Sequence, residues 1–264
     1  MRVRVENISF EYPGGFTLRE IDLDAPRGSF LGLIGPNGSG KSTLLKLMCG
    51  ALRPTSGRVL LEDRLISEYR PRELARIMAV ISAEQYFDFP FMVRDVVAMG
   101  RFPHTRRYAD SRQQDSEAVD AALTLTDLLD LQDRPISQLS SGERQRALIA
   151  RALAQEPSVM LLDEPDAHLD LHHQLNIFRL LTRLNRERSM TIVVVLHDLT
   201  SAAAFCRELV LLDKGMMIGH GTPAAVIAPE TIARVYGPGV VVCPNPVTDG
   251  PMVTITGETE ANQL

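Results

Sequence analysis

Gly35-Pro36-Asn37-Gly38-Ser39-Gly40-Lys41-Ser42-Thr43 is the stretch around which the rest of this chain is organised. It matches the pattern G-x-x-x-x-G-K-[S/T] of a phosphate-binding loop. The apolar run over residues 29–34 predicts a buried strand before the loop, and residues 44–49 predict a helix after it, with Gly50 placed to end that helix. A chance glycine-rich turn is the alternative, but it would not require this strand and this helix on either side.

The residue types in this loop explain how it would hold phosphate. Glycines allow the backbone to turn its N–H groups onto phosphate oxygens, and the following helix N-terminus adds partial positive charge. In this pattern the lysine, here Lys41, reaches the β- and γ-phosphates, and the hydroxyl of Ser42 binds Mg²⁺.

Composition limits the class of protein. The chain has 264 residues, of which 45% are hydrophobic and 23% charged, as in an ordinary water-soluble domain. No apolar run is long enough to span a bilayer, and the N-terminus lacks the apolar block of a signal peptide, so we expect a cytoplasmic protein with three reduced cysteines. The net charge of −5 argues against a protein whose main task is to hold nucleic acid.

Alternating strand and helix patterns predict an α/β fold with a mostly parallel sheet. Strands are predicted over residues 2–10, 16–23, 29–34, 58–62, 77–81, 158–165, 191–196 and 208–213. Helices are predicted over residues 44–49, 71–76, 93–99, 110–125, 140–154, 171–184, 223–228 and 231–236. We therefore expect one domain over 1–264, with an antiparallel β region over about 1–34, an inserted helical subdomain over about 86–137 and a C-terminal tail over about 219–264, whose end is proline- and glycine-rich and frayed beyond Gly257.

Two aromatic features leave alternatives open. Tyr12 lies just before the predicted turn at 13–15, where it could stack on adenine or be an ordinary turn tyrosine. Residues 82–91 mix polar groups with aromatic residues, which suggests a contact loop, although simple packing of Phe89 and Phe91 is the alternative.

A second candidate anion site lies far along the chain. Ser140-x-x-Glu143 forms a capping box, so a helix with small residues and free N–H groups at its tip begins there. By itself, a capping box indicates only the start of a helix.

Chemistry-bearing residues follow two buried strands. Asp163 and Glu164 end the apolar strand over 158–165, at the edge where α/β proteins bind ligands. Asp163 suits Mg²⁺ coordination, and Glu164 suits polarising an attacking water. His197 follows the β-branched strand over 191–196 and could reach a γ-phosphate, a generic loop histidine being the alternative.

Three further histidines, at 168, 172 and 173, could suggest a metal site. No carboxylate or cysteine framework accompanies them, so the sequence disfavours one.

Taken in order, the phosphate loop (Walker A), Leu139-Ser140-Ser141-Gly142-Glu143, Leu161-Leu162-Asp163-Glu164-Pro165, Leu169-Asp170 and His197 resemble an ABC-transporter ATP-binding subunit. The resemblance implies a RecA-like P-loop NTPase core that hydrolyses ATP with Mg²⁺. It makes Tyr12 the adenine-stacking aromatic, Asp163 the Mg²⁺ aspartate, Glu164 the catalytic glutamate and His197 the switch histidine. It also makes Asp170 the D-loop aspartate.

The same resemblance implies partners. The family works as a head-to-tail dimer, in which Ser140, Ser141 and Gly142 of one copy close on the ATP held by the phosphate loop of the other. A homodimer would then act on integral membrane permease subunits, at the cytoplasmic face of the inner membrane, and indirectly on a substrate-binding protein, with no nucleic acid involved.

Finer detail resembles subunits that import iron–siderophore complexes, haem or cobalamin. The matching pieces are Phe89-Pro90-Phe91, the segment 97–104, His168-Leu169-Asp170-Leu171 and Gly221-Thr222-Pro223. Alternatives are an ATPase subunit for another substrate or for export, a non-transport ABC ATPase acting on nucleic acid or ribosomes, and a small-molecule P-loop kinase, which would leave the segment 139–143 unexplained.

Two positions depart from the family pattern. Ser141 stands where glycine is commonest, and its small size is expected to be tolerated. The glutamine that usually follows the strand near Ile81 would fall on Ala83. We nominate Gln85 as the residue that serves in catalysis and at the metal, with Glu84 or a water as the alternatives.

Overall fold

The predicted α/β architecture is confirmed in the computed structural model, which describes residues 1–82, 89–104, 111–248 and 250–256. Within these ranges a six-stranded sheet has the order β10-β9-β3-β8-β7-β6. Its strands are β3 (Phe30–Ile34), β6 (Met78–Ile81), β7 (Val159–Asp163), β8 (Thr191–Val195), β9 (Glu208–Asp213) and β10 (Met216–Gly221). All neighbours pair in parallel except β10, which joins β9 antiparallel through a turn at Lys214 and Gly215.

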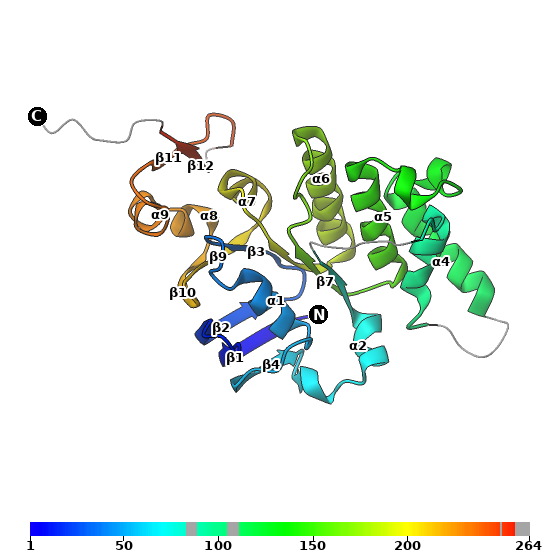
Figure 1. The fold of residues 1–264 in the computed structure, drawn as a ribbon, viewed down its shortest axis with the longest axis horizontal. Coiled ribbons are helices and arrows are strands. Elements are labelled where there is room, and N and C mark those ends of the chain that lie inside the picture. The colour runs from blue at the N-terminus through cyan, green and yellow to red at the C-terminus, as the bar shows by residue number, and fades with distance from the viewer. Residues whose placement is uncertain (83–88, 105–110, 249, 257–264) are drawn as a thin grey trace, which may run out of the picture.

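The N-terminal region forms the predicted antiparallel sheet. Its strands are β1 (Val3–Glu11), β2 (Thr17–Ala25), β4 (Ser56–Leu61) and β5 (Arg64–Leu65), in the order β2-β1-β4-β5. Figure 1 shows this sheet beside α1 (Lys41–Met48), the helix that follows the phosphate loop. The helix begins at Lys41 rather than at residue 44 as predicted, because the loop runs directly into its first turn.

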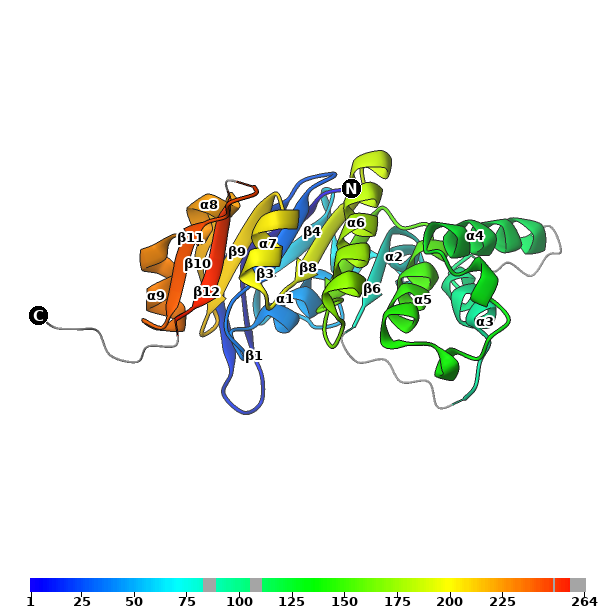
Figure 2. The same ribbon diagram turned by 90° about the horizontal axis from the view of Figure 1, so that it is seen from above.

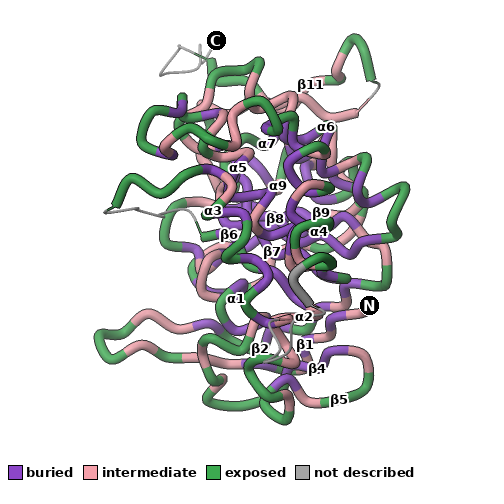
Figure 3. Tube along the Cα trace, turned by 90° about the vertical axis from the view of Figure 1, so that its right-hand side faces the viewer, coloured by how far each residue is buried: buried purple, intermediate pink, exposed green. Residues whose placement is uncertain are grey.

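Two apolar clusters lie on opposite faces of the parallel sheet. Alternate residues of β8 divide between them: Ile192 and Val194 pack in the cluster with α5 and α6, and Val193 and Val195 pack in the cluster with α1 and the N-terminal sheet. All five residues of β8 are buried, as predicted for an interior strand, and Figure 3 shows the buried trace along β7 and β8. Because the strands are buried on both faces, their ends are held in place. The residues that follow each strand end are therefore held in place as well.

Several helices pack together at one end of the molecule. They are α3 (Val93–Ala98), α4 (Ser111–Leu125) and α5 (Ser141–Ala154), and α2 (Pro71–Ile77) lies nearby. The predicted apolar face of the long helix is confirmed, since Val119, Ala122 and Leu123 are all buried.

Arg101 joins α4 to the end of α5 and to the segment after it. Its guanidinium donates to the carbonyl of Ala154 at 2.7 Å and to the carboxylates of Asp115 at 2.8 Å and Glu156 at 2.6 Å. Nearby, Nε2 of His104 lies 3.0 Å from the carbonyl oxygen of Gln155. The segment 97–104 noted in the sequence thus has a structural role, because its polar side chains tie elements together.

The C-terminal region lies at the opposite end of the molecule in Figures 1 and 2. It contains α8 (Pro223–Val226), α9 (Pro229–Tyr236) and a hairpin of β11 (Val240–Pro244) and β12 (Pro251–Ile255). The hairpin packs on α7 (Leu199–Phe205) and α9 and corrects the prediction, which placed no strand after residue 236. The helix α6 (Leu171–Arg188) also extends four residues beyond its predicted end at 184.

No helix among the described residues combines the length and the apolar character that a membrane crossing needs.

Candidate functional site

Strand register brings the predicted site residues to one edge of the sheet. Val195 of β8 pairs with Leu33 of β3 on one side and with Asp163 of β7 on the other. The phosphate loop, Glu164 and His197 each follow one of these aligned strand ends. The carboxyl edge of a parallel sheet is where α/β folds bind ligands, so the sheet itself assembles this site.

The lysine of the phosphate loop is held inside the loop. Nζ of Lys41 donates to the carbonyl of Gly35 at 2.8 Å and to that of Pro36 at 3.1 Å. Burial lowers the pKa of Lys41, while the carboxylates of Glu164 and Asp163 act in the opposite direction. The ammonium group therefore sits at the loop with partners that a phosphate oxygen could replace.

Glycine is required at the start of this loop. Gly35 has a φ of 145°, and a Cβ there would lie 2.1 Å from the carbonyl oxygen of Leu212. Gly38 and Gly40 also have positive φ, of 76° and 109°. These backbone conformations are costly for any residue with a side chain, which explains the glycine positions of the motif.

Ser42 and Asp163 meet although they are far apart in the sequence. Oγ of Ser42 donates to Oδ1 of Asp163 at 2.9 Å. Burial raises the pKa of Asp163, against the effect of the Ser42 hydrogen bond. A hydroxyl and a carboxylate oxygen side by side are hard oxygen donors of the type that Mg²⁺ prefers, so these residues fit the predicted metal role.

Glu164 and His197 form a second contact. Nε2 of His197 lies 2.6 Å from Oε1 of Glu164. Glu164 has a left-handed backbone with φ 51°, and its N–H donates to the carbonyl of Val195 at 3.2 Å. A left-handed non-glycine residue is uncommon, and here it turns the chain at the strand end, with the Glu164 carboxylate beside the loop.

A pocket of about 470 Å³ joins these groups to the aromatic residues of the N-terminal sheet. It is lined by Tyr12, Phe16, Asn37, Gly38, Gly40, Lys41, Ser42, Thr43 and Glu164. Tyr12 is packed edge-on against Phe10 with ring centroids 4.7 Å apart. Phe16 was not predicted as a site residue, and its only sequence signal was a second aromatic across the turn from Tyr12.

The predicted signature segment, residues 139–143, stands apart from this pocket. None of Ser140, Ser141, Gly142 and Asp170 is among the residues that line it. Ser140 caps α5 in the predicted capping box: its Oγ accepts from the N–H of Glu143 at 3.3 Å, and Glu143 accepts from the N–H of Ser140 at 2.8 Å. Ser140 and Ser141 are both exposed.

The glycine of this segment is covered by a histidine that sequence reasoning did not assign to the site. A Cβ on Gly142 would lie 2.4 Å from Cγ of His173. The N–H of His173 donates to Oδ1 of Asp170 at 2.8 Å, which makes Asp170 the N-cap of α6. Asp170 therefore fixes the helix that carries the ring against Gly142.

Several other sequence predictions can be placed. Gln85 and Glu84, the two candidates for the missing glutamine, lie outside the described residues. Among the residues that are described, no group of three or more histidine, cysteine, aspartate or glutamate side chains could hold a metal ion. Phe89 is 67% exposed and Phe91 is 36% exposed, which favours the contact-loop interpretation over simple packing.

Comparison with known proteins identifies the family. The model of the ABC transporter family matches residues 18–167. The chain belongs to the ABC transporter family. Among curated relatives of this family, the chain is 38% identical to the ferric enterobactin transport ATP-binding protein FepC of Escherichia coli over 98% of this chain and 95% of the relative. It is 39% identical to the hemin import ATP-binding protein HmuV of Rhodococcus jostii, over 95% and 85% of the two chains.

Solved structures of the family agree. An inward-facing putative metal-chelate type ABC transporter has a chain similar to this one with a TM-score of 0.83, at 29% identity and 95% coverage of both chains. The ATP-binding cassette MJ0796, a dimer in a post-hydrolysis state bound to ADP and Pi, has a TM-score of 0.72 at 29% identity, over 84% of this chain and 98% of the other.

Proposed function

We propose that this chain is the ATP-hydrolysing subunit that powers import of an iron–siderophore, haem or cobalamin-type substrate through a membrane permease. The observation that carries the proposal is the convergence of Lys41, the Ser42–Asp163 pair and the Glu164–His197 pair at one sheet edge. Those groups supply phosphate binding, metal ligands and a base for water. They are the parts that phosphoryl transfer to water requires.

The residues divide this work according to their positions. The loop N–H groups and Lys41 bind the phosphates, and an aromatic side chain of the pocket, Tyr12 or Phe16, stacks on the base. Glu164 orients the attacking water and accepts its proton, while His197 orients the Glu164 carboxylate and faces the γ-phosphate. Most of the rate then comes from positioning and charge stabilisation rather than from covalent chemistry.

Ser42 and Asp163 are the described residues that would hold Mg²⁺, and Gln85 is proposed as a further ligand and catalytic residue. When bound, the ion neutralises charge on the phosphate oxygens. The protein's own contribution is to keep the two donors together, which the Ser42–Asp163 hydrogen bond does.

The site is proposed to be complete only in a homodimer. Ser140 and Ser141 are exposed at the tip of α5, and they do not line the pocket of their own chain. A helix N-terminus with free N–H groups suits a phosphate, which in this arrangement belongs to the ATP of the second copy. Asp170, at the tip of the neighbouring α6, would face the same interface.

Membrane partners are proposed to dock beside the helical region. Exposed apolar side chains gather before and within it, including Phe89, Met92 and Phe102, the last of which is 80% exposed. A groove of about 660 Å³ is lined by residues that precede the helical region in the sequence. Its lining includes Tyr69, Leu74 and Val80. Permease helices seated here, at the cytoplasmic face of the membrane, would receive the motion of the closing dimer.

The substrate class follows from relatives and not from the site. FepC is named for ferric enterobactin transport, HmuV for hemin import, and a further relative from Halobacterium salinarum for cobalamin import. An ATPase site has no contact with cargo, so specificity belongs to the permease and the substrate-binding protein.

The test is to co-purify the chain with its permease, reconstitute both in liposomes and add substrate-binding protein loaded with ferric siderophore, haem or cobalamin. We expect one loaded form to stimulate ATP hydrolysis and to deliver cargo across the membrane. Hydrolysis that no loaded form stimulates would contradict the proposed substrate class. Absence of any ATP hydrolysis would contradict the enzymatic assignment itself.

A further inference from the structure

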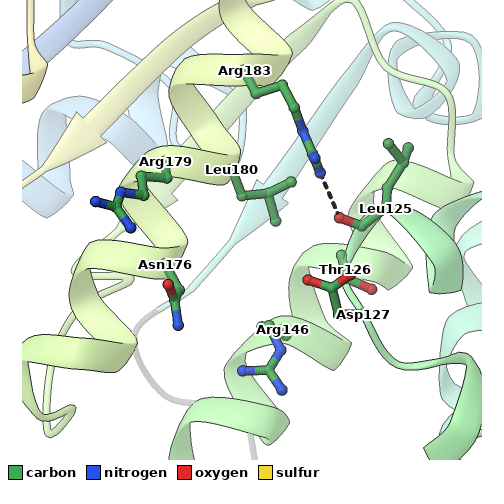
Figure 4. A pocket seen from close by; sticks show the side chains of 8 residues that line it. All are labelled: Leu125, Thr126, Asp127, Arg146, Asn176, Arg179, Leu180 and Arg183. Atoms are coloured by element: carbon green, nitrogen blue, oxygen red, sulfur yellow. Dashed lines mark hydrogen bonds between the residues drawn. The ribbon is translucent and has the colours of Figure 1, made fainter.

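A cavity separate from the ATP pocket lies where α4, α5 and α6 meet. Its volume is about 290 Å³. It is lined by Leu125, Thr126, Asp127, Arg146, Asn176, Arg179, Leu180 and Arg183. Figure 4 shows Arg183 reaching from α6 toward the end of α4, with Arg146 rising from α5 below. We call this cavity the arginine pocket.

The charge of the arginine pocket opposes that of the whole chain. Three guanidinium groups, from Arg146, Arg179 and Arg183, line it together with one carboxylate, Asp127. The chain as a whole has a net charge of −5. Gathering like charges around one cavity is unfavourable unless an anion enters it.

Among the described residues, none of the three arginines makes an ion pair. Within the described part of the chain, Arg183 donates to one group, the backbone carbonyl of Leu125, at 2.9 Å. The carboxylate of Glu143, one turn before Arg146 on α5, is engaged by the N–H and hydroxyl of Ser140, each at 2.8 Å.

A second observation, besides the missing ion pairs, concerns Arg146. Its Nε is fully buried and has no hydrogen-bond partner. Buried N–H groups are nearly always paired in proteins, so this guanidinium has hydrogen-bonding capacity that the described residues leave unused. Arg179 and Arg183 are exposed and stand at the rim, so the pocket has one guanidinium at its base and two at its mouth.

We infer that the arginine pocket binds a small anion that carries at least two phosphate or carboxylate groups. Guanidinium groups pair with either acceptor through two parallel hydrogen bonds. One anionic group would meet Arg146 at the base, and a second would meet Arg183 at the rim, with Arg179 adding positive charge on the same helix. Leu125 and Leu180 provide an apolar wall for the connecting part of the ligand.

Such a ligand would join two parts of the fold. Arg146 belongs to α5, the helix that begins at the signature segment, whereas Arg179 and Arg183 belong to α6. A bound anion would therefore hold α5 against α6. This site lies outside the ATP pocket and does not depend on the proposed transport function.

Calorimetric titration with pyrophosphate and, separately, with citrate tests the inference at constant ionic strength. The full chain should carry Lys41→Ala, which removes phosphate binding at the ATP loop. We expect saturable binding of one anion per chain by at least one probe. Replacing Arg179 and Arg183 together by alanine should weaken it at least about ten-fold, since each charged hydrogen bond contributes strongly.

The matched control replaces Arg186 and Arg188 together by alanine. These residues are exposed, lie on the same helix and do not line the pocket, so the net charge changes equally. Binding in the control should stay within about two-fold, because distant surface charges are screened by salt. Binding of pyrophosphate alone assigns the site to phosphates, and binding of citrate alone assigns it to carboxylates.

Two results would overturn the inference. One is the absence of saturable binding by either probe to the Lys41→Ala chain. The other is an equal loss of affinity in the control pair, which would indicate attraction by overall charge. The rim arginines are chosen because they are exposed, and a normal thermal unfolding curve would show that both variants remain folded.

Discussion

His197 and Glu164 touch across two neighbouring strand ends, with Nε2 of the histidine 2.6 Å from Oε1 of the glutamate. Glu164 follows β7 and His197 follows β8, and the register of those strands brings the two side chains together. The carboxylate is one-quarter exposed and the imidazole nearly half exposed, so both can reach a ligand. This pair forms the part of the site that would act on water.

Glu164→Gln should bind ATP and hydrolyse it at least about 100-fold more slowly, because glutamine keeps the shape of the side chain but cannot accept the proton. Nucleotide binding by equilibrium dialysis and phosphate release by a steady-state assay check the two halves of this statement. Glu187→Gln, on the exposed side of α6, is the control and should leave both unchanged. Full turnover in Glu164→Gln would remove this residue from the proposed role.

His197→Ala should also slow hydrolysis, and its effect should not multiply with that of Glu164→Gln. The histidine acts through the carboxylate it touches, so the double variant is expected to be about as slow as the slower single one. A steady-state ATPase double-mutant cycle measures this coupling. Independent effects, with the rate losses multiplying in the double variant, would argue that the 2.6 Å contact has no part in turnover.

Local chemistry made most of the site predictable from sequence. The phosphate loop has a fixed spacing because its glycines need positive φ, and Asp163 and Glu164 end an apolar run long enough to be a buried strand. Pairwise contacts were not predictable in the same way. The Ser42–Asp163 and Glu164–His197 contacts depend on which strands are neighbours in the sheet. The hydrophobic pattern of a single segment does not predict the order of the strands.

The C-terminal hairpin was not predicted, and it depends on a contact between residues far apart in the sequence. Prolines and glycines lie in and around β11 and β12, and neither strand has a strong alternating pattern, so the sequence predicts an irregular tail there. Thr200 of α7 stabilises the hairpin from outside: the N–H of Val253 donates to its Oγ1 at 3.1 Å, and that hydroxyl lies 3.3 Å from the Val253 carbonyl.

Thr200→Val should therefore lower the free energy of unfolding by about 1–3 kcal/mol, since it leaves the N–H of Val253 without its partner while keeping the side-chain volume. Urea unfolding followed by circular dichroism measures the change. Thr254→Val, an exposed threonine on the same strand, is the control and should change stability little. Equal stability of Thr200→Val and the natural chain would show that the hairpin does not depend on this contact.

Asp163→Asn should stabilise the protein in the absence of nucleotide while weakening its response to Mg²⁺ and ATP. Burial raises the pKa of Asp163, so the folded state holds a proton more tightly than the unfolded state does. The stability that protonated Asp163 contributes is then lost as the pH rises through its pKa in the folded state. Asparagine carries no charge to bury, and its oxygen can still accept from Ser42.

The stabilisation by Asp163→Asn should depend on pH. The gain in melting temperature should be largest near neutral pH and should shrink as the pH approaches about 4, near the ordinary pKa of aspartate. Each 1 kcal/mol corresponds to roughly 2–4 °C for a chain of this size class. A melting temperature below that of the natural chain at neutral pH would show that burial of this charge does not dominate its energetics.

Gly142→Ala tests the packing of the signature segment on α6. Gly142 lies in the first turn of α5, where glycine to alanine ordinarily stabilises a helix by about 0.5–1 kcal/mol. Here the added Cβ would meet the His173 ring at 2.4 Å from Cγ, and the Asp170 cap holds the start of α6 in place. We therefore expect the opposite sign, a loss of about 1–3 kcal/mol from overpacking.

Removing the ring should restore the lost stability. The double variant Gly142→Ala, His173→Ala is expected to recover most of the melting temperature, because the two side chains compete for one space. Ser141→Ala, an exposed neighbour in the same turn, is the control and should not respond to His173→Ala. If the double variant melts no higher than Gly142→Ala alone, the glycine is not required by the His173 contact.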